Sequence, residues 1–221
     1  MSDEARVWER ALRMRELLLA CDVAGLRSLC DDGFWERVGE TELVPLSRDA
    51  ESAEMLGVLG RRSLMLVETP RGEVPRWALE QQWAGDAYLV EDQRLFSLVD
   101  RAEVEASGDA QRLARLQTKL AAQDAGARYA ARLAAHDADG VAAMWTESFR
   151  EAHGAEVLPR IGDVRAAELI AGVGPRTLVR CRFDEGEETV EVLWREAENG
   201  WLVQGARTFR RPPAGGGAPE A

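Results

Sequence analysis

The residues best suited to metal binding or nucleophilic chemistry are three cysteines and two histidines: Cys21, Cys30, Cys181, His136 and His153. Structural zinc sites and disulfide frameworks place such residues at short, repeated spacings such as Cys-x-x-Cys. The cysteines here are odd in number and widely spaced, and neither histidine lies at metal-ligand spacing from them. The sequence therefore predicts no metal site, no cofactor and no disulfide framework, and it favours unreactive thiols in a reducing compartment.

Two aspartates, Asp22 and Asp137, recur at matching places, each just before a short apolar segment. An Asp in front of a helix is a common N-cap, because its side-chain oxygen accepts a hydrogen bond from a first-turn N–H group. We interpret both as caps rather than as catalytic carboxylates. His136 corresponds to a cysteine in the other copy, and His153 is expected in an exposed loop. With no phosphate loop, nucleophile elbow or His-Glu-x-x-His pair, the sequence predicts no catalytic residues.

The charge of the chain limits its partners. It has 221 residues, with 28 basic and 39 acidic side chains, so the net charge is 28 − 39 = −11. Such a surface repels phosphate, which argues against nucleic acid and anionic membranes as partners. The sequence opens without a signal peptide, and no apolar stretch approaches the ~18 residues of a membrane span. We expect a soluble, cytoplasmic protein with a substantial core, since 46% of its residues are hydrophobic.

An internal repeat organises the chain. When the sequence is shifted by about 115 positions against itself, glycines and apolar anchors match in one register. The matches include Gly25 with Gly140, Phe34 with Phe149, and Gly57 with Gly172. We interpret the chain as two copies of one unit, residues 3–100 and 109–210. Residues 101–108 then form a linker, and the Pro- and Gly-rich residues 211–221 a disordered tail.

Each copy shows the same predicted order of elements. A first helix (4–20, and up to 135) is followed by a short helix after the Asp cap. An extended piece comes next (42–46, 156–161), and each contains a proline. A third helix begins near residues 49 and 163 and ends at Gly57 and Gly172, because glycine is a common C-terminal stop. Antiparallel strands close each copy, at 64–68, 76–83 and 88–99, and at 177–183, 188–195 and 200–210. Turns are expected at residues 71–72 and 199–200.

This order of elements resembles the NTF2-like superfamily, which includes the SnoaL-like polyketide cyclases and ketosteroid isomerase. Residues 129–144 look like the opening of such a domain, in which an aromatic helix leads into an Asp-capped second helix. Residues 190–195 and 200–203 look like its last hairpin. The resemblance implies an α+β fold. It would consist of two degenerate tandem units, each with three helices packed on a curved antiparallel sheet, forming an internal pseudo-dimer.

The resemblance also implies where a pocket would lie. In family members that are enzymes, a tyrosine on the first helix can point into the cone and donate a hydrogen bond to a substrate oxygen, and here that residue is Tyr129. The general base would come from the following extended piece, which offers only Glu156 and Asp163 near its ends, so the acid–base set is incomplete. Among seven tryptophans, Trp145 and Trp194 are expected to be buried in the second copy. Tyr129, Trp145 and Trp194 are the ligand-pocket candidates.

Two classes of function follow from these observations. The first is a non-catalytic protein-binding or scaffolding protein, whose acidic surface would select a basic protein partner. The alternative is a small-molecule enzyme of the SnoaL or isomerase kind, or a carrier of an apolar ligand, that uses the pocket of the second copy. An enzyme requires at least two titratable groups converging in an apolar cavity, and the sequence offers only Tyr129. We therefore expect no turnover of a small substrate.

Overall fold

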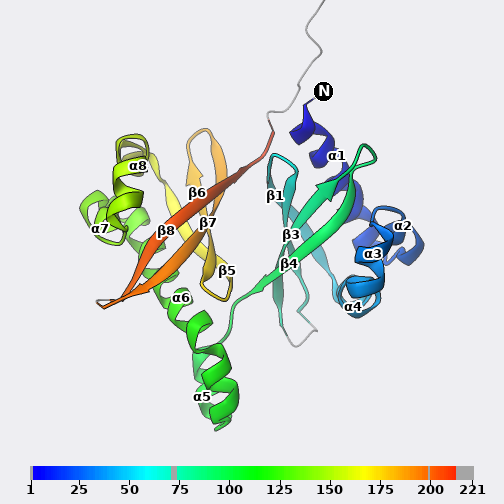
Figure 1. The fold of residues 1–221 in the computed structure, drawn as a ribbon, viewed down its shortest axis with the longest axis horizontal. Coiled ribbons are helices and arrows are strands. Elements are labelled where there is room, and N and C mark those ends of the chain that lie inside the picture. Colours follow the sequence, from blue (N-terminus) through cyan, green and yellow to red (C-terminus); the bar gives the residue numbers. More distant parts are fainter. Residues whose placement is uncertain (1, 71–73, 199, 213–221) are drawn as a thin grey trace, which may run out of the picture. The chain divides into compact units, whose positions relative to one another are not determined.

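The computed structural model describes residues 2–70, 74–198 and 200–212 (Figure 1). The chain divides into two units, residues 1–95 with 209–221, and residues 96–208. Each unit is described by itself. The turn expected at residues 71–72, Asn199 of the second turn, and residues 213–221 of the expected tail lie outside the described residues.

Unit 1 begins with α1 (Asp3–Leu19), capped by the Ser2 hydroxyl, which accepts a hydrogen bond from the backbone N–H of Ala5. Its apolar residues lie at helical spacing and face the core, where Val7, Ala11 and Met14 are fully buried. Short helices follow, α2 (Val23–Ser28) and α3 (Asp32–Phe34). They lead into a π-helix, η1 (Trp35–Leu43), and then α4 (Val44–Asp49).

The expected extended piece and third helix of each copy are wrong. Residues 42–46 are helical because Pro45 occupies the first turn of α4, where the missing proline N–H would have no partner anyway. Pro159 has the same place in the 3₁₀-helix η2 (Leu158–Asp163). The expected helices instead form strands β1 (Ser52–Leu59) and β5 (Ala166–Val173).

Gly57 is therefore no helix stop. It lies within β1, where the strand passes close to the backbone of Arg210, and a Cβ atom at this position would lie 2.6 Å from the Arg210 nitrogen. Glycine is required here because two backbones approach each other closely.

The sheet of unit 1 is antiparallel and follows chain order. It contains β1, β2 (Arg62–Glu68), β3 (Arg76–Ala84) and β4 (Leu89–Ser97). Met55 pairs with Met65, and a bulge follows before Gly57 pairs with Leu64. At the other edge of β1, Val58 pairs with Arg210, which also belongs to unit 1. Helix α1 packs across β1 and β2 and buries the core against them (Figure 1).

Unit 2 repeats this order with a longer first helix. Residues Arg101–Ala106 of the expected linker form α5, and α6 (Ala110–Ala134) follows. Next come α7 (Ala138–Ala143), α8 (Glu147–Val157) and η2. Strand β5 then opens an antiparallel sheet with β6 (Arg176–Phe183), β7 (Gly186–Ala197) and β8 (Gly200–Arg210). Helix α6 packs across β5 and β6. Mixed helix and antiparallel sheet agree with the expected α+β class.

Local details recur in both units. Cys21 and His136 both have left-handed backbones, with φ of 51° and 58°. The next residue in each copy caps a helix, as predicted, with the Asp22 and Asp137 carboxylates accepting from the N–H groups of residues 25 and 140. Isolated parallel bridges also correspond, joining Cys30 to Val90 and Trp145 to Val203. The helical segments that precede the sheet therefore have the same local structure in both units.

The match of Gly57 with Gly172 is wrong by one residue. The bulges of β1 and β5 lie between Met55 and Gly57 and between Leu169 and Ala171, so Gly57 corresponds to Ala171. The extra residue of unit 1 is accommodated in the π-helix η1, whose counterpart in unit 2 is the regular helix α8. A π-helix is the usual result of one inserted residue in a helix.

Candidate functional site

A largely apolar cavity of about 100 Å³ lies in unit 2, lined from α6, α8, η2 and strands β6, β7 and β8. It is partly enclosed and has a polar mouth. Its lining residues are Tyr129, Leu133, Trp145, Phe149, Val157, Arg160, Ile161, Val164, Cys181, Phe183, Glu188, Val190, Ala206 and Thr208. Two of the three ligand-pocket candidates from the sequence, Tyr129 and Trp145, thus lie at one cavity.

Tyr129 reaches the cavity from the buried face of α6 and is 6% exposed. Burial disfavours the phenolate and raises the pKa of Tyr129 to about 12, while a side-chain interaction with Trp145 works in the opposite direction. Because that value lies far above neutrality, the hydroxyl keeps its proton at physiological pH and can donate a hydrogen bond.

Trp145 lies just before α8, and its backbone pairs with a neighbouring strand. It forms a parallel bridge with Val203, and its ring meets Phe149 edge-on at 5.1 Å between centroids. Its side chain is buried, as predicted. Its indole Nε1 is buried and has no hydrogen-bond partner among the described residues. Since a buried N–H group without a partner is costly, this group is the natural place to look for a function.

The third candidate, Trp194, is buried as predicted but does not line the cavity. Its indole Nε1 donates to the Thr177 hydroxyl at 2.8 Å, and its ring meets Tyr129 edge-on with centroids 5.8 Å apart. Trp194 therefore packs against the Tyr129 ring and belongs to the core.

The mouth of the cavity carries charges that the sequence analysis did not select. Arg160 of η2 donates to the Glu188 carboxylate of β7 at 2.9 Å, and the Arg160 guanidinium stacks over Phe183 at 5.3 Å. The deeper Cys181 is 3% exposed, and burial raises the pKa of its thiol to about 12. Glu188 could have been found from the alternation of β7, which puts it on the same face as Val190.

The other titratable candidates lie away from the cavity lining. His136, Glu156 and Asp163 are exposed, and none of them lines the cavity. His153 is exposed as expected, but it lies within the helix α8 and not in a loop, and its ring centroid is 4.6 Å from that of Phe149. The structure therefore does not bring Glu156 or Asp163 to Tyr129 as a general base.

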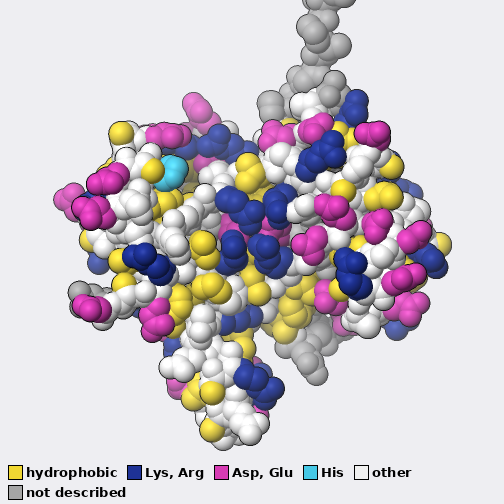
Figure 2. Space-filling model, viewed as in Figure 1, with side chains coloured by type: hydrophobic (Ala, Val, Ile, Leu, Met, Phe, Trp, Pro, Cys, Tyr) yellow, Lys and Arg dark blue, Asp and Glu magenta, His cyan; other side chains and the backbone are white. Residues whose placement is uncertain are grey.

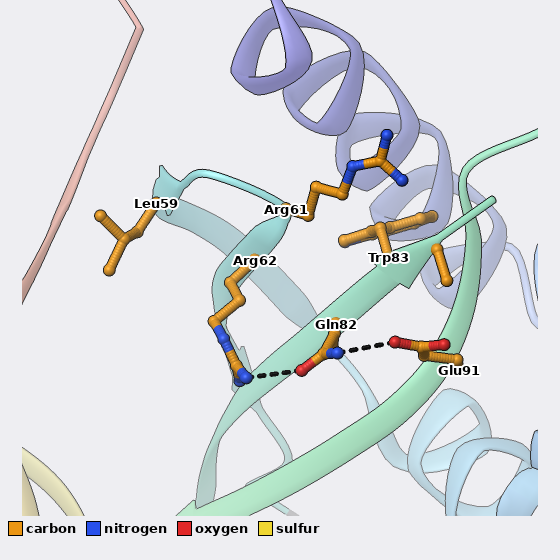
Figure 3. Close-up of a pocket in the computed structure, with 7 residues that line it drawn as sticks. Leu59, Arg61, Arg62, Gln82, Trp83 and Glu91 are labelled. Atoms are coloured by element: carbon orange, nitrogen blue, oxygen red, sulfur yellow. Dashed lines mark hydrogen bonds between the residues drawn. The ribbon is translucent and has the colours of Figure 1, made fainter. Parts of the chain in front are cut away.

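In unit 1 the corresponding positions are filled by core residues. Met14 stands where unit 2 has Tyr129, and Cys30 where it has Trp145, and both belong to the buried cluster of unit 1. A pocket of about 280 Å³ in this unit is instead polar and lies at the surface. Figure 3 shows its chain of hydrogen bonds, from Arg62 to Gln82 (2.5 Å) and from Gln82 to Glu91 (2.6 Å).

A buried carboxylate between two arginines recurs in both sheets and was missed by the sequence analysis. Glu80 is 2% exposed and pairs with Arg62 and Arg94. In unit 2, Glu191 is 1% exposed and pairs with Arg176 and Arg207. The three positions correspond one to one, on the second, third and fourth strands of each sheet. In each cluster the two arginines compensate the buried carboxylate, so we assign the clusters to stability.

The arginines of β6 also differ from expectation. The alternation of Arg180 and Arg182 in the sequence is typical of one solvated strand face, but Arg180 is only 8% exposed and lies 3.9 Å from Glu168. The expectation fails because β6 is buried on both of its faces over most of its length. Elsewhere charges are mixed, and Figure 2 shows acidic and basic side chains interspersed rather than one uniformly acidic face in that view.

No family model, curated protein or solved structure matches this chain. Within the described ranges, no three His, Cys, Asp or Glu side chains gather as a metal site would require. None of the helices that the structure describes is long and apolar enough to cross a membrane.

Proposed function

We propose that this chain is a non-catalytic binding protein whose unit 2 holds a small, largely apolar molecule. The observation that carries the proposal is the cavity of about 100 Å³ lined by Tyr129, Trp145, Phe149 and aliphatic side chains. Ligand sites are typically concave and apolar with a few polar groups that fix orientation, and this cavity has that composition. Unit 1, with Met14 and Cys30 in the corresponding places, is the structural partner in this proposal.

The size of the cavity limits the ligand. An apolar cavity of about 150 Å³ in another protein binds benzene, so the present space of about 100 Å³ encloses a short branched chain or only part of a six-membered ring. A larger molecule would leave its remainder at the mouth, next to Arg160 and Glu188.

The ionisation of the lining residues argues against catalysis. The pKa values of Tyr129 and Cys181 are both raised to about 12, so neither a phenolate nor a thiolate forms at neutral pH. The remaining titratable pair at the mouth is Glu188 and Arg160, whose carboxylate and guanidinium are engaged with each other. A nucleophile or base that is protonated, or engaged in an ion pair, lowers a reaction barrier only slightly.

A second candidate function is an acid–base enzyme of the isomerase kind. It is favoured by one observation, that Glu188 and Tyr129 line the same cavity and so form the pair of titratable groups that the sequence lacked. In this alternative Glu188 would be the base and Tyr129 the donor.

The remaining predictions from the sequence belong to the same proposal. An assignment to the NTF2-like superfamily is supported only by the helices that precede and pack on an antiparallel sheet in each unit, since the extended piece and the third helix of the expected order are not formed. A basic protein partner is supported by the net charge of −11. A cytoplasmic location is supported by cysteines that form no disulfide among the described residues.

The test is a calorimetric titration of the whole chain with methylenecyclohexane and cyclohexanone, together with an assay for turnover. We expect binding by the parent, loss of binding in Val190→Phe, which fills the cavity, and retained binding in Val190→Ala. We expect no turnover. Turnover that disappears in Glu188→Gln, in a protein that still melts cooperatively, would replace this proposal by the enzyme.

A further inference from the structure

The mouth of the unit 2 cavity already holds a cation, which belongs to the chain itself. The Cζ atom of Arg160 lies 5.3 Å from the centroid of the Phe183 ring, and its guanidinium donates a hydrogen bond of 2.9 Å to the Glu188 carboxylate. All three residues line the cavity. An aromatic face attracts positive charge, and a neighbouring carboxylate adds to that attraction. The mouth therefore has the composition of a site for a positive group.

The two charges of this ion pair differ in burial. The Glu188 side chain is 16% exposed, whereas that of Arg160 is 44% exposed. Because a charge that is removed from water needs compensation, the carboxylate is the group that requires a cation at this place. The guanidinium is carried by the 3₁₀-helix η2 and can turn into solvent at low cost, since much of it is exposed already. The carboxylate is thus the fixed group, and the arginine is the exchangeable one.

The apolar part of a ligand and its polar group would occupy different places. The cavity behind the mouth has a volume of about 100 Å³ and is lined mainly by aromatic and aliphatic side chains. It encloses a short branched hydrocarbon chain, and the remainder of the ligand then lies at the mouth, next to Glu188.

The surroundings of the mouth favour a positive group there over a negative one. An anion would lie against the Glu188 carboxylate and the aromatic face of Phe183, and both repel negative charge. At longer range, the net charge of −11 attracts cations and repels anions. A ligand cation could replace the Arg160 guanidinium, so that Glu188 and Phe183 would each keep a positive neighbour.

Building on the proposed function, we infer that the ligand of unit 2 is an alkylammonium ion. Its short branched chain fills the cavity, and its ammonium group takes the place of the Arg160 guanidinium beside Glu188 and Phe183. Arg160 competes for the same place, covers the mouth of the empty site, and turns into solvent when the amine binds.

The test compares three probes that carry the same branched chain, by calorimetric titration of the whole protein. At neutral pH 3-methylbutylamine is a cation, 3-methylbutan-1-ol is neutral and 3-methylbutanoate is an anion. We expect the parent to bind the amine about three- to tenfold more tightly than the alcohol, because a charge-assisted hydrogen bond is stronger than a neutral one. The carboxylate should bind most weakly.

Three variants give effects of different sign. Glu188→Gln should abolish the preference for the amine while the alcohol still binds. Arg160→Gln should strengthen amine binding about two- to fivefold, since it removes a competing, partly exposed ion pair. Arg182→Gln is the control, because it removes the same charge from an ion pair with Glu187, and neither of these residues lines the cavity. Its affinity for the amine should equal that of the parent.

A nitrogen–proton NMR spectrum gives a second readout that needs no variant. The Nε–H resonance of Arg160 should move to the position of a solvent-exposed arginine when the amine binds, because the guanidinium leaves the Phe183 ring. The alcohol should leave this resonance in place. A merely structural ion pair would not respond to the charge of the probe.

Several results would overturn the inference but leave the proposed function. They are equal affinities for amine and alcohol in the parent, a preference that survives Glu188→Gln, weaker amine binding in Arg160→Gln, and an Arg160 resonance that the bound amine does not move. Tighter binding of the carboxylate, lost in Arg160→Gln, would do the same. Failure of all three probes to bind the parent would overturn the proposed function, and this inference with it.

Discussion

The indole N–H of Trp194 donates a hydrogen bond of 2.8 Å to the hydroxyl of Thr177, deep in unit 2. The corresponding bond in unit 1 joins Trp83 to Ser63 at 2.9 Å. Each fully buried ring thus has its one polar atom satisfied by a hydroxyl on the neighbouring strand. This recurrence separates the tryptophans of the core from Trp145, whose N–H has no such partner.

Thr177→Val should destabilise the chain by about 1–3 kcal/mol, because the isosteric change leaves the Trp194 N–H buried without an acceptor. Chemical denaturation measures the change. In a double-mutant cycle with Trp194→Phe, the two losses should not add, since either substitution removes the same hydrogen bond. Additive losses would show that this bond does not contribute.

Glu191→Ala should destabilise the chain by about 3 kcal/mol, since it removes the buried carboxylate from between Arg176 and Arg207. Asp184→Ala is the control, because Asp184 and its partner Arg165 have side chains 71% and 60% exposed. We expect a much smaller loss there, because water and salt screen an exposed ion pair. Similar losses in the two variants, measured by urea denaturation, would contradict the structural role of the buried cluster.

Gly57→Ala should cost about 1–3 kcal/mol, because the added Cβ atom would lie 2.6 Å from the Arg210 nitrogen and force two strands apart. Gly162→Ala adds the same methyl group where no atom lies within 4 Å, so its melting temperature should stay close to that of the parent. A Gly57→Ala protein that melts like the parent would show that β1 and residue 210 do not pair.

The thiols should differ sharply in reactivity. Cys21 is exposed, whereas burial raises the pKa of both Cys30 and Cys181 to about 12. Iodoacetamide at pH 8 should therefore modify the folded chain once, at Cys21, and the unfolded chain three times, as mass spectrometry can measure. Rapid modification of Cys181 in the folded chain would contradict the closed interior of unit 2.

The same shifts predict a loss of stability at high pH. The folded state keeps these two thiols protonated up to about pH 12, whereas the unfolded state ionises them near their ordinary pKa of 9.0. Their contribution is therefore complete below pH 9.0 and declines as the pH rises toward 12.

Local chemistry made part of this fold predictable. The Asp22 and Asp137 caps depend on a side-chain oxygen a few residues from its N–H partner, and both form as the sequence predicts. The burial of Trp145 and Trp194 also follows from pattern alone. Pro45 misled the analysis, because a proline is compatible both with an extended edge and with the first turn of a helix.

Features that depend on distant residues could not be predicted. Gly57 has the sequence signature of a helix end, and only the approach of Arg210, far away in the chain, explains it. Glu191 has the signature of an exposed strand residue until Arg207 is brought beside it. At the site, Tyr129 was selected from the sequence, but the nearness of Glu188 at the same cavity depends on how β7 pairs within the sheet.

Trp145 offers the most direct test of the proposed site, because each of the seven tryptophans gives its own indole N–H resonance in a nitrogen–proton NMR spectrum. Addition of cyclohexanone to the whole chain should shift the Trp145 resonance until the site is saturated. The Trp83 resonance of unit 1 should stay in place. An unmoved Trp145 resonance, or a saturable shift confined to the tryptophans of unit 1, would contradict ligand binding in the unit 2 cavity.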